Sequence, residues 1–208
     1  MSSTLTTPSM GGDSSVDNSK RTWLIASSCA GAVGAGFVAV PFVSSFSPSE
    51  RAKAAGAAVE VDISALKPGE KLTVEWRGKP VWIVRRTPEQ LAALKALAPQ
   101  LADPDSKRTA IENPKYSINE ARSIKPEVLV VIGICTHLGC SPSDKFTTGA
   151  QPSLPDDWAG GFFCPCHGST FDMAGRVYKN KPAPDNLEVP PHMYLSDNRL
   201  IIGEDKKA

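Results

Sequence analysis

Two short segments rich in cysteine and histidine constrain this chain more than any other feature. The first reads Cys-Thr-His-Leu-Gly-Cys over residues 135–140, and the second reads Cys-Pro-Cys-His-Gly-Ser over residues 164–169. Together they hold four of the five cysteines and two of the three histidines in 208 residues. Cysteines that only packed a core would be scattered, so this grouping indicates a metal site, a disulfide, or both.

Three kinds of site are compatible with these segments. A structural zinc site takes two cysteines and two histidines, but it leaves one cysteine in each segment without a role. Disulfides alone leave both histidines unexplained. A Rieske-type [2Fe–2S] cluster uses two cysteines on one iron and two histidines on the other. The two spare cysteines, one per segment, can then join the loops.

The two segments resemble the cluster-binding loops of the Rieske iron–sulfur subunit of bacterial cytochrome bc complexes, which are quinol–cytochrome c oxidoreductases. The resemblance extends to an N-terminal apolar segment, the linker that follows it, and the Lys-Pro-Ala-Pro sequence at residues 181–184. It implies a mainly β fold: an antiparallel Rieske-type β domain with a short inserted helix, plus one N-terminal transmembrane helix.

The resemblance implies the ligands of one [2Fe–2S] cluster. Cys135 and Cys164 would bind the inner iron, and His137 and His167 the outer iron near the surface. Soft thiolates suit iron–sulfur chemistry, and neutral imidazoles carry less negative charge than thiolates, which raises the reduction potential. Because an imidazole can also exchange a proton, His167 is expected to accept the hydrogen bond and the proton of a quinol.

The resemblance also implies roles for residues beside the ligands. Cys140 and Cys166 would form a disulfide between the loops, which indicates an oxidising compartment. A crosslink of this span contributes about 3.5 kcal/mol by loop entropy. Ser169 would donate a hydrogen bond to a cluster sulfide, and Leu138 would shield the cluster edge and touch a partner.

Three positions depart from the family's pattern or lie outside it. Phe171 stands where high-potential members carry a tyrosine whose hydroxyl bonds a ligand sulfur, so a very high potential is not expected. The segment Ser141–Phe163 is longer than in mitochondrial-type members, and we expect its tip to protrude. His192 matches no ligand and is expected at the surface.

The N-terminal region predicts a membrane anchor. Residues 1–20 are rich in Ser, Thr and Gly and are expected to form a disordered cytoplasmic tail. Residues 21–46 are expected to form the transmembrane helix, because the 21 residues Trp23–Val43 carry no charge and would span a hydrocarbon layer of about 30 Å. A cleavable signal peptide is the alternative interpretation.

Charges beside the anchor predict its orientation. Lys20 and Arg21 precede the apolar stretch, and the positive-inside rule then places the tail in the cytoplasm and the body in the periplasm of a bacterial inner membrane. The sequence from Ser19 to Leu24 also resembles a twin-arginine export signal with lysine in the first position. That route carries folded proteins, as a cofactor inserted in the cytoplasm would require.

The rest of the chain is expected to form a hinge, residues 47–58, and a cluster-binding domain, residues 59–208. Alternation and apolar runs predict strands, and leucine spacing after a proline predicts one helix. The expected strands are Val59–Ser64, Leu72–Trp76, Val81–Arg85, Val128–Ile134, Met193–Leu195 and Arg199–Ile202, and the expected helix is Pro88–Leu97.

The resemblance implies an electron-transfer subunit of a quinol–cytochrome c reductase. It would take one electron from quinol through the cluster and pass it to a c-type cytochrome, with cytochrome b and that cytochrome as partners in a dimeric complex. The net charge of +1 gives no indication of nucleic-acid binding. The alternatives are a Rieske subunit of another periplasmic oxidoreductase, such as arsenite oxidase, and a structural zinc-binding interaction module.

Overall fold

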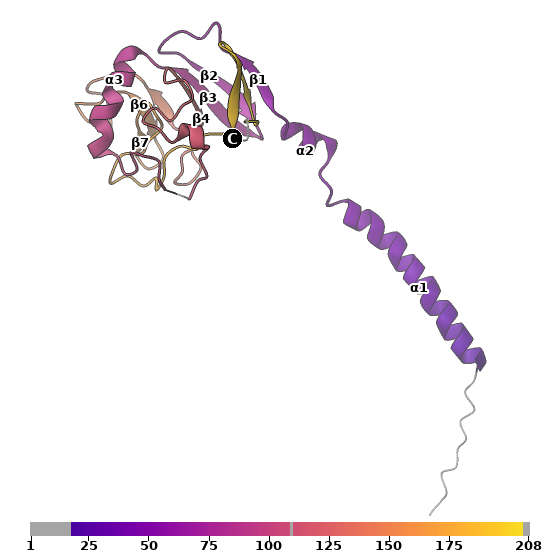
Figure 1. Cartoon of the computed structure of the whole chain (residues 1–208). Coiled ribbons are helices and arrows are strands. Elements are labelled where there is room, and N and C mark those ends of the chain that lie inside the picture. The colour runs from indigo at the N-terminus through magenta and orange to yellow at the C-terminus, as the bar shows by residue number, and fades with distance from the viewer. Residues whose placement is uncertain (1–17, 109, 206–208) are drawn as a thin grey trace, which may run out of the picture. The chain divides into compact units, whose positions relative to one another are not determined.

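The structure is a computed structural model, which describes residues 18–108 and 110–205 (Figure 1). The chain divides into two compact units between Ser49 and Glu50. The first unit contains the helix α1 (Asn18–Ser44), and the second contains every described strand. Each unit is considered by itself below.

Helix α1 has the length and composition of a membrane span. Its 27 residues carry only two charged side chains, both near its start, and none of its residues is buried in protein. At about 1.5 Å per residue it is roughly 40 Å long, enough to cross a bilayer. The helix begins at Asn18, so residues 18–20 are helical and their assignment to a disordered tail was wrong. The rest of the predicted tail lies outside the described residues.

The predicted hinge contains a short helix, α2 (Glu50–Ala55). Lys53 donates to the Glu50 carboxylate across one turn, at 2.7 Å. A six-residue helix is only marginally stable in water, because one or two turns barely offset the cost of nucleation. The hinge therefore has local order that is easily lost.

The body consists of three antiparallel three-stranded sheets, in agreement with the predicted fold class. Their strand orders are β1-β9-β8, β2-β3-β4 and β5-β6-β7. The strands are β1 (Val59–Asp62), β2 (Lys71–Trp76), β3 (Lys79–Arg85), β4 (Val128–Ile132), β5 (Ser143–Lys145), β6 (Gly161–Cys164), β7 (Ser169–Phe171), β8 (His192–Ser196) and β9 (Arg199–Ile202).

The central sheet β2-β3-β4 is covered on both faces. Along β3, Val81 and Ile83 point into one apolar cluster, whereas Trp82 and Val84 point into another. Successive strand residues face opposite sides, so a strand buried on both sides must be apolar throughout. This explains the unbroken apolar run of β4, Val128–Ile132, which ends two residues before the predicted strand Val128–Ile134 does.

One face of the central sheet packs against the sheet β1-β9-β8. We call the buried cluster between them the base core. Its members are Val61, Ile63, Leu66, Trp76, Val81, Ile83, Val128, Val130, Ile132, Leu200 and Ile202. The first and last strands of the body meet here, since β1 pairs with β9 along its whole length.

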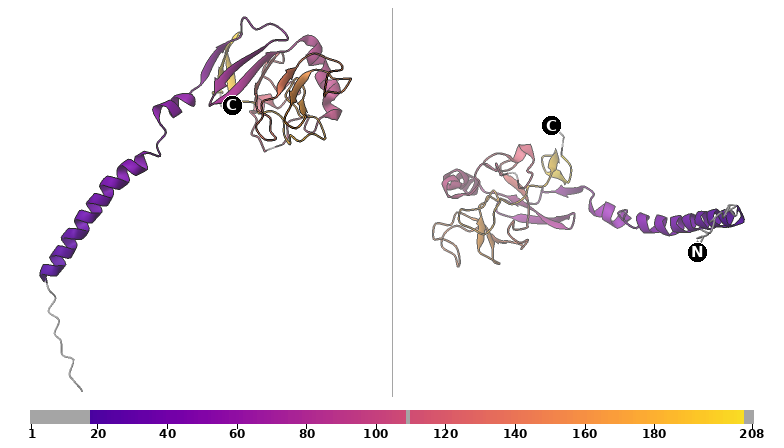
Figure 2. Two further views of the ribbon diagram at one scale, coloured as in Figure 1. Left: turned by 180° about the vertical axis from the view of Figure 1, so that it is seen from behind. Right: turned by 90° about the horizontal axis from the view of Figure 1, so that it is seen from below.

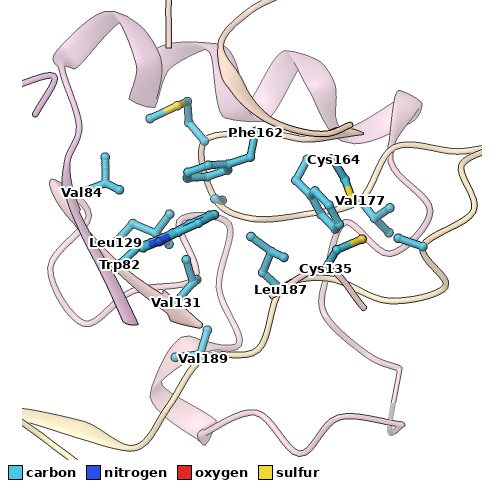
Figure 3. Close-up of a cluster of buried hydrophobic side chains, with 14 of the residues drawn as sticks. Trp82, Val84, Leu129, Val131, Cys135, Phe162, Cys164, Val177, Leu187 and Val189 are labelled. Carbon is cyan, nitrogen blue, oxygen red and sulfur yellow. The ribbon is translucent and has the colours of Figure 1, made fainter. Parts of the chain in front are cut away.

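The other face packs against β6, β7 and the loops around them (Figure 3). We call this cluster the site-side core. Its members are Trp82, Val84, Leu94, Leu129, Val131, Cys135, Phe162, Cys164, Phe171, Met173, Ala174, Val177, Ala183, Leu187 and Val189. Figures 1 and 2 show β6 and β7 on the side of the central sheet away from β1. The two cores therefore lie on opposite faces of one sheet.

Helix α3 (Pro88–Leu97) agrees with its predicted bounds. Thr87 accepts a hydrogen bond from the backbone N–H of Gln90, and the Gln90 side chain accepts one from the backbone N–H of Thr87, which completes a capping box. Leu94 and Leu97 face the interior. Two short 3-10 helices, η1 (Ala98–Gln100) and η2 (Lys115–Ser117), follow in an otherwise irregular stretch.

The long segment between the cysteine-rich loops is anchored to the body near its end. Trp158 is buried against Tyr178, Leu97 at the end of α3 and Leu101 just after η1. Its indole N–H donates to the Lys145 carbonyl at 2.8 Å. Residues around the tip, such as Thr148 and Ser153, are exposed. The segment thus carries its own small apolar contact, which the sequence analysis did not anticipate.

His192 is buried, with 1% of its surface exposed, so its predicted surface position was wrong. It begins β8, and its ring meets the ring of Tyr116 edge-on at 5.3 Å between centroids. Its Nδ1 lies 2.8 Å from the Pro190 carbonyl oxygen, and its backbone N–H donates to the Tyr116 hydroxyl. An aromatic neighbour distant in sequence covers the ring, and no local pattern indicates that.

Candidate metal centre

The two cysteine-rich loops are positioned by the strands that border the site-side core. The first loop follows β4, and the second connects β6 to β7. In each, a glycine N–H donates to the carbonyl of the cysteine four residues earlier: Gly139 to Cys135 at 3.1 Å, and Gly168 to Cys164 at 2.9 Å. Both glycines have positive φ, +81° and +75°, a conformation that other residues adopt at a cost. The same turn therefore shapes both loops.

A disulfide joins the loops. It links Cys140 to Cys166, whose Cα atoms are 6.7 Å apart, and it confirms the predicted pairing. The sulfur atoms of Cys140, Cys166 and Cys164 all lie within 4.8 Å of one another. Because two of these sulfurs are already bonded to each other, they offer no thiolate to a metal. The disulfide instead brings the remaining groups of the loops together.

The remaining cysteines of the loops, Cys135 and Cys164, are buried thiols in the site-side core (Figure 3). Burial raises the pKa of Cys135, and the neighbouring Cys164 raises it further, whereas the His137 backbone N–H and the Ser169 hydroxyl lower it. Two thiolates side by side in apolar surroundings need a positive charge to be stable. A metal ion supplies that charge.

The two loop histidines, His137 and His167, lie side by side. The ring centroids of His137 and His167 are 4.7 Å apart and the rings are perpendicular. Nδ1 of His137 is buried and has no hydrogen-bond partner among the described residues. A buried ring nitrogen without a partner is unfavourable, and metal ligation would satisfy it. His167 is exposed and His137 is partly exposed, so this side of the site faces solvent.

The residues beside the candidate ligands have different degrees of exposure. Ser169 is fully buried, and its oxygen accepts the Ala183 N–H at 3.0 Å, which leaves its hydroxyl hydrogen for the nearby Cys135 sulfur. Leu138 is 70% exposed at the tip of the first loop. Phe171 is fully buried in the core that contains both thiols. Thus Ser169 and Phe171 support the site from inside, and Leu138 faces outward.

A third segment holds the loops from the side. The Thr136 hydroxyl donates to the Asp185 carbonyl at 2.7 Å, and the Arg108 guanidinium donates to the Pro184 carbonyl. The sequence analysis singled out residues 181–184 but missed Thr136 and Arg108. Thr136 is a polar residue between the candidate ligands Cys135 and His137, and this position could have drawn attention to it. No local feature of the sequence pointed to Arg108.

The site therefore combines two buried thiols, two imidazoles facing solvent and a disulfide outside the ligand set. A tetrahedral zinc ion and a [2Fe–2S] cluster both accept two cysteines and two histidines. The serine hydroxyl beside a buried cysteine sulfur suits a group that gains negative charge, because such a donor stabilises the reduced form. Zinc does not change its oxidation state in proteins, so this donor fits the cluster better.

Comparisons with known proteins identify the family. Residues 98–191 match the model of the Rieske [2Fe-2S] domain, and residues 13–49 match that of the "Ubiquitinol-cytochrome C reductase Fe-S subunit TAT signal". The ubiquinol-cytochrome c reductase iron-sulfur subunit of Allochromatium vinosum is 58% identical over 187 residues, which cover 90% of this chain and 89% of that protein. The subunit of the same name from Rhodospirillum rubrum is 40% identical over 90% of this chain and 93% of its own length.

Among solved structures, a chain of a hyperthermophilic respiratory Complex III is similar, with 28% sequence identity and a TM-score of 0.43. The match covers 85% of this chain and 97% of that one. The family assignment depends on the curated relatives, which match the present chain over nearly its whole length. The chain carries one [2Fe–2S] cluster and has an electron-transfer role. It belongs to the Rieske iron–sulfur subunits of the membrane-anchored ubiquinol–cytochrome c reductases.

Proposed function

We propose that Cys135 and Cys164 bind the inner iron of the cluster, and that His137 and His167 bind the outer iron. One observation carries this assignment: a disulfide outside the ligand set joins two loops that each offer a buried thiol and an imidazole on the solvent side. The unpartnered Nδ1 of His137 is the ligand atom expected on that residue.

The cluster, when bound, supplies a one-electron redox centre. His167 is the exposed imidazole, so it is the group that accepts a hydrogen bond and then a proton from a quinol. Ser169 donates toward the Cys135 sulfur and stabilises added negative charge. Leu138 covers the solvent edge and contacts the partner that delivers the quinol. In the proposed reaction, His167 binds the quinol, Ser169 stabilises the added charge and Leu138 excludes water from the cluster edge.

The proposed partners are cytochrome b, which holds the quinol, and a c-type cytochrome, which receives the electron in a dimeric complex. Support comes from the names of relatives, which include a cytochrome b-c1 complex subunit of Nicotiana tabacum that is 43% identical over 163 residues. To reach two partners the head must move. The short helix α2 offers a place where the linker bends or extends at small cost.

The proposed orientation places the N-terminus in the cytoplasm and the cluster domain in the periplasm, with α1 crossing the inner membrane once. Lys20 and Arg21 at the start of α1 support this topology. The export-signal match over residues 13–49 and the disulfide, which persists in an oxidising compartment, support it as well.

The EPR spectrum of the dithionite-reduced complex tests the proposal. We expect a [2Fe–2S] signal with mixed nitrogen and sulfur ligation, and iron rather than zinc in a metal assay. Zinc as the bound metal, or a spectrum of purely thiolate ligation, would contradict the proposed ligand set. Protease access to the head from the periplasmic side of intact spheroplasts tests the orientation separately.

The family assignment decides between this function and the two alternatives from the sequence. The match to the Rieske [2Fe-2S] domain argues against a zinc module. The relatives named as ubiquinol-cytochrome c reductase subunits favour that complex over another oxidoreductase. Co-purification of b-type and c-type haem with the chain tests this choice directly.

A further inference from the structure

Three arginines are fully enclosed by the body, which is unusual for so polar a side chain. Arg86, Arg122 and Arg176 expose 2%, 0% and 1% of their surface. Among the described residues the only other buried groups of fixed charge are the carboxylates of Asp103 and Asp172. Three positive and two negative charges leave a net charge of +1 inside the protein.

The arginines converge on the turn that follows the second cluster loop. Arg86 donates to the Met173 carbonyl at 3.0 Å, and Arg122 donates to the carbonyls of Ala174 and Gly175 at 3.1 and 3.3 Å. Arg176 pairs with Asp172 at 2.7 Å. Every residue from 172 to 175 thus contributes an oxygen to a buried guanidinium. This turn begins directly after β7, whose first residue is Ser169.

Within the described part of the chain, Arg176 alone among the three has a carboxylate partner at contact distance. The other contacts of Arg86 are the Ala121 carbonyl and the Ser123 hydroxyl, and those of Arg122 are the Leu187 carbonyl and the Asn113 side-chain oxygen. The Nε–H groups of Arg86 and Arg122 have no partner in the described part of the chain. Burial lowers the pKa of both arginines to about 10, so both remain charged at neutral pH.

The turn that these arginines hold is close to the cluster site. From Ser169 to Asp172 the chain advances three residues, at most about 10 Å in an extended strand. Cys164 pairs directly with Ser169 across the sheet. On the other side, Arg122 donates to the carbonyl of Leu187, which belongs to the same buried cluster as Cys135 (Figure 3). The intervening space is the apolar site-side core, where solvent screens little.

Burying an unpaired charge is costly, and uncharged residues could fill the same volume more cheaply. Uncharged side chains could hold the turn equally well, so the feature that only these arginines supply is their positive charge. We infer that Arg86 and Arg122 raise the reduction potential of the cluster, because the buried arginines outnumber the buried carboxylates by one and so place a net positive charge behind its second loop. A reduced cluster carries one more negative charge, which nearby positive charge stabilises. The inference rests on the proposed ligand set and identifies Arg86 and Arg122 as positioning residues with an electrostatic role.

An EPR-monitored redox titration of the purified complex tests the inference. Arg122→Gln removes the charge and should lower the midpoint potential, whereas Arg122→Lys keeps it and should stay near the wild-type value. Arg86→Gln should also lower the potential. Asp172→Asn removes a negative charge and should raise it. Arg77→Gln is the matched control, because Arg77 is exposed on the β2–β3 turn and solvent screens its charge.

The outcomes separate charge from packing. A fall in midpoint potential of equal size in Arg122→Gln and Arg122→Lys would overturn the inference. The potential would then depend on the hydrogen-bonding geometry of the guanidinium and not on its charge. Unchanged potentials in both glutamine variants with normal spectra would also overturn it. If the glutamine variants fail to retain the cluster, the Asp172→Asn potential decides, and a value that does not rise counts against the inference. Absence of a Rieske signal in the wild-type complex would instead refute the proposed ligand set.

Discussion

The two faces of the central sheet are built in different ways. The base core is apolar throughout, and the strands that form it follow one another with short connections or pair along their whole length. The site-side core contains two thiols and borders a disulfide and the buried arginines. The first is stabilised by the burial of apolar surface, whereas the second also needs covalent and polar links between its loops. The body therefore has a stable base and a site that depends on additional links.

Loss of one imidazole should have the largest effect on this contrast. His137→Ala is expected to abolish the Rieske EPR signal, because the outer iron would lose one of its two proposed protein ligands. The β-sheet circular dichroism of the base should persist. His192→Gln is the matched control, since His192 lies in β8 away from the loops, and this variant should keep the signal. A normal spectrum in His137→Ala would contradict the assignment of this ligand.

Removal of the disulfide should come next. Cys140→Ser leaves the proposed ligands intact but frees the two loops, at a cost of about 3.5 kcal/mol by the loop-entropy estimate. We expect a cluster that is lost at lower temperature, a lower midpoint potential and slower quinol turnover in the complex. Thermal loss of the EPR signal measures the first effect. Equal thermal stability of variant and wild type would show that the loops are held without the bridge.

A cavity in the base core should separate stability from redox chemistry. Ile83 is fully buried on the base side of β3, and its truncation in Ile83→Ala should lower the free energy of unfolding by about 2–5 kcal/mol. The midpoint potential should not change. Val84→Ala, one residue along on the other face, is the control that should disturb the site as well. A potential shift in Ile83→Ala would show that the two cores are coupled.

Phe171→Tyr should raise the midpoint potential of the cluster without disrupting the site-side core. The ring is fully buried in the core that holds both proposed thiolate ligands. We expect a hydroxyl on this ring to donate to one of their sulfurs. If the gain is that of one net hydrogen bond, about 0.5–1.5 kcal/mol, the midpoint potential rises by roughly 20–65 mV. Voltammetry measures the shift. A potential that stays or falls, with an intact EPR spectrum, would mean that the hydroxyl does not reach the sulfur.

The smallest effect should be a pH dependence of the base. Burial lowers the pKa of His192, so below about pH 6.5 the unfolded chain binds a proton that the folded chain excludes. This group therefore contributes stability above that pH and loses it as the pH falls, by at most about 1.4 kcal/mol per unit. Urea unfolding at pH 7.5 and 5.5 should show a smaller difference in His192→Gln than in wild type. An equal difference would assign the pH dependence to other groups.

The base was largely predictable from the sequence, because its strands carry apolar patterns that local rules interpret. Strands β3 and β4 and the helix α3 lie within a residue or two of their predicted bounds. The disulfide and the fold class also followed from the motif and its family. These features depend on residues close together in the chain or on a specific spacing.

The remainder depends on contacts between distant segments. His192 is covered by Tyr116, 76 positions earlier, and Trp158 packs against Leu97 at the end of α3. Arg122 reaches carbonyls more than 50 positions away. A charged side chain is normally at the surface, so the sequence offers no reason to place this one inside. Local patterns cannot show which distant groups will satisfy it.

Because β1 pairs with β9, the first strand of the domain cannot find its partner until β9 has been made. Strand β9 lies between β1 and β8, so the sheet at the base has no middle until residues Arg199–Ile202 have been made. A chain that stops short of them leaves two strands with open edges and a base core without Leu200 and Ile202. The native sheet at the base can thus form only after these residues have been made, and a chain truncated before them is open to aggregation and proteolysis. Strand β9 therefore makes formation of the base depend on the presence of residues Arg199–Ile202.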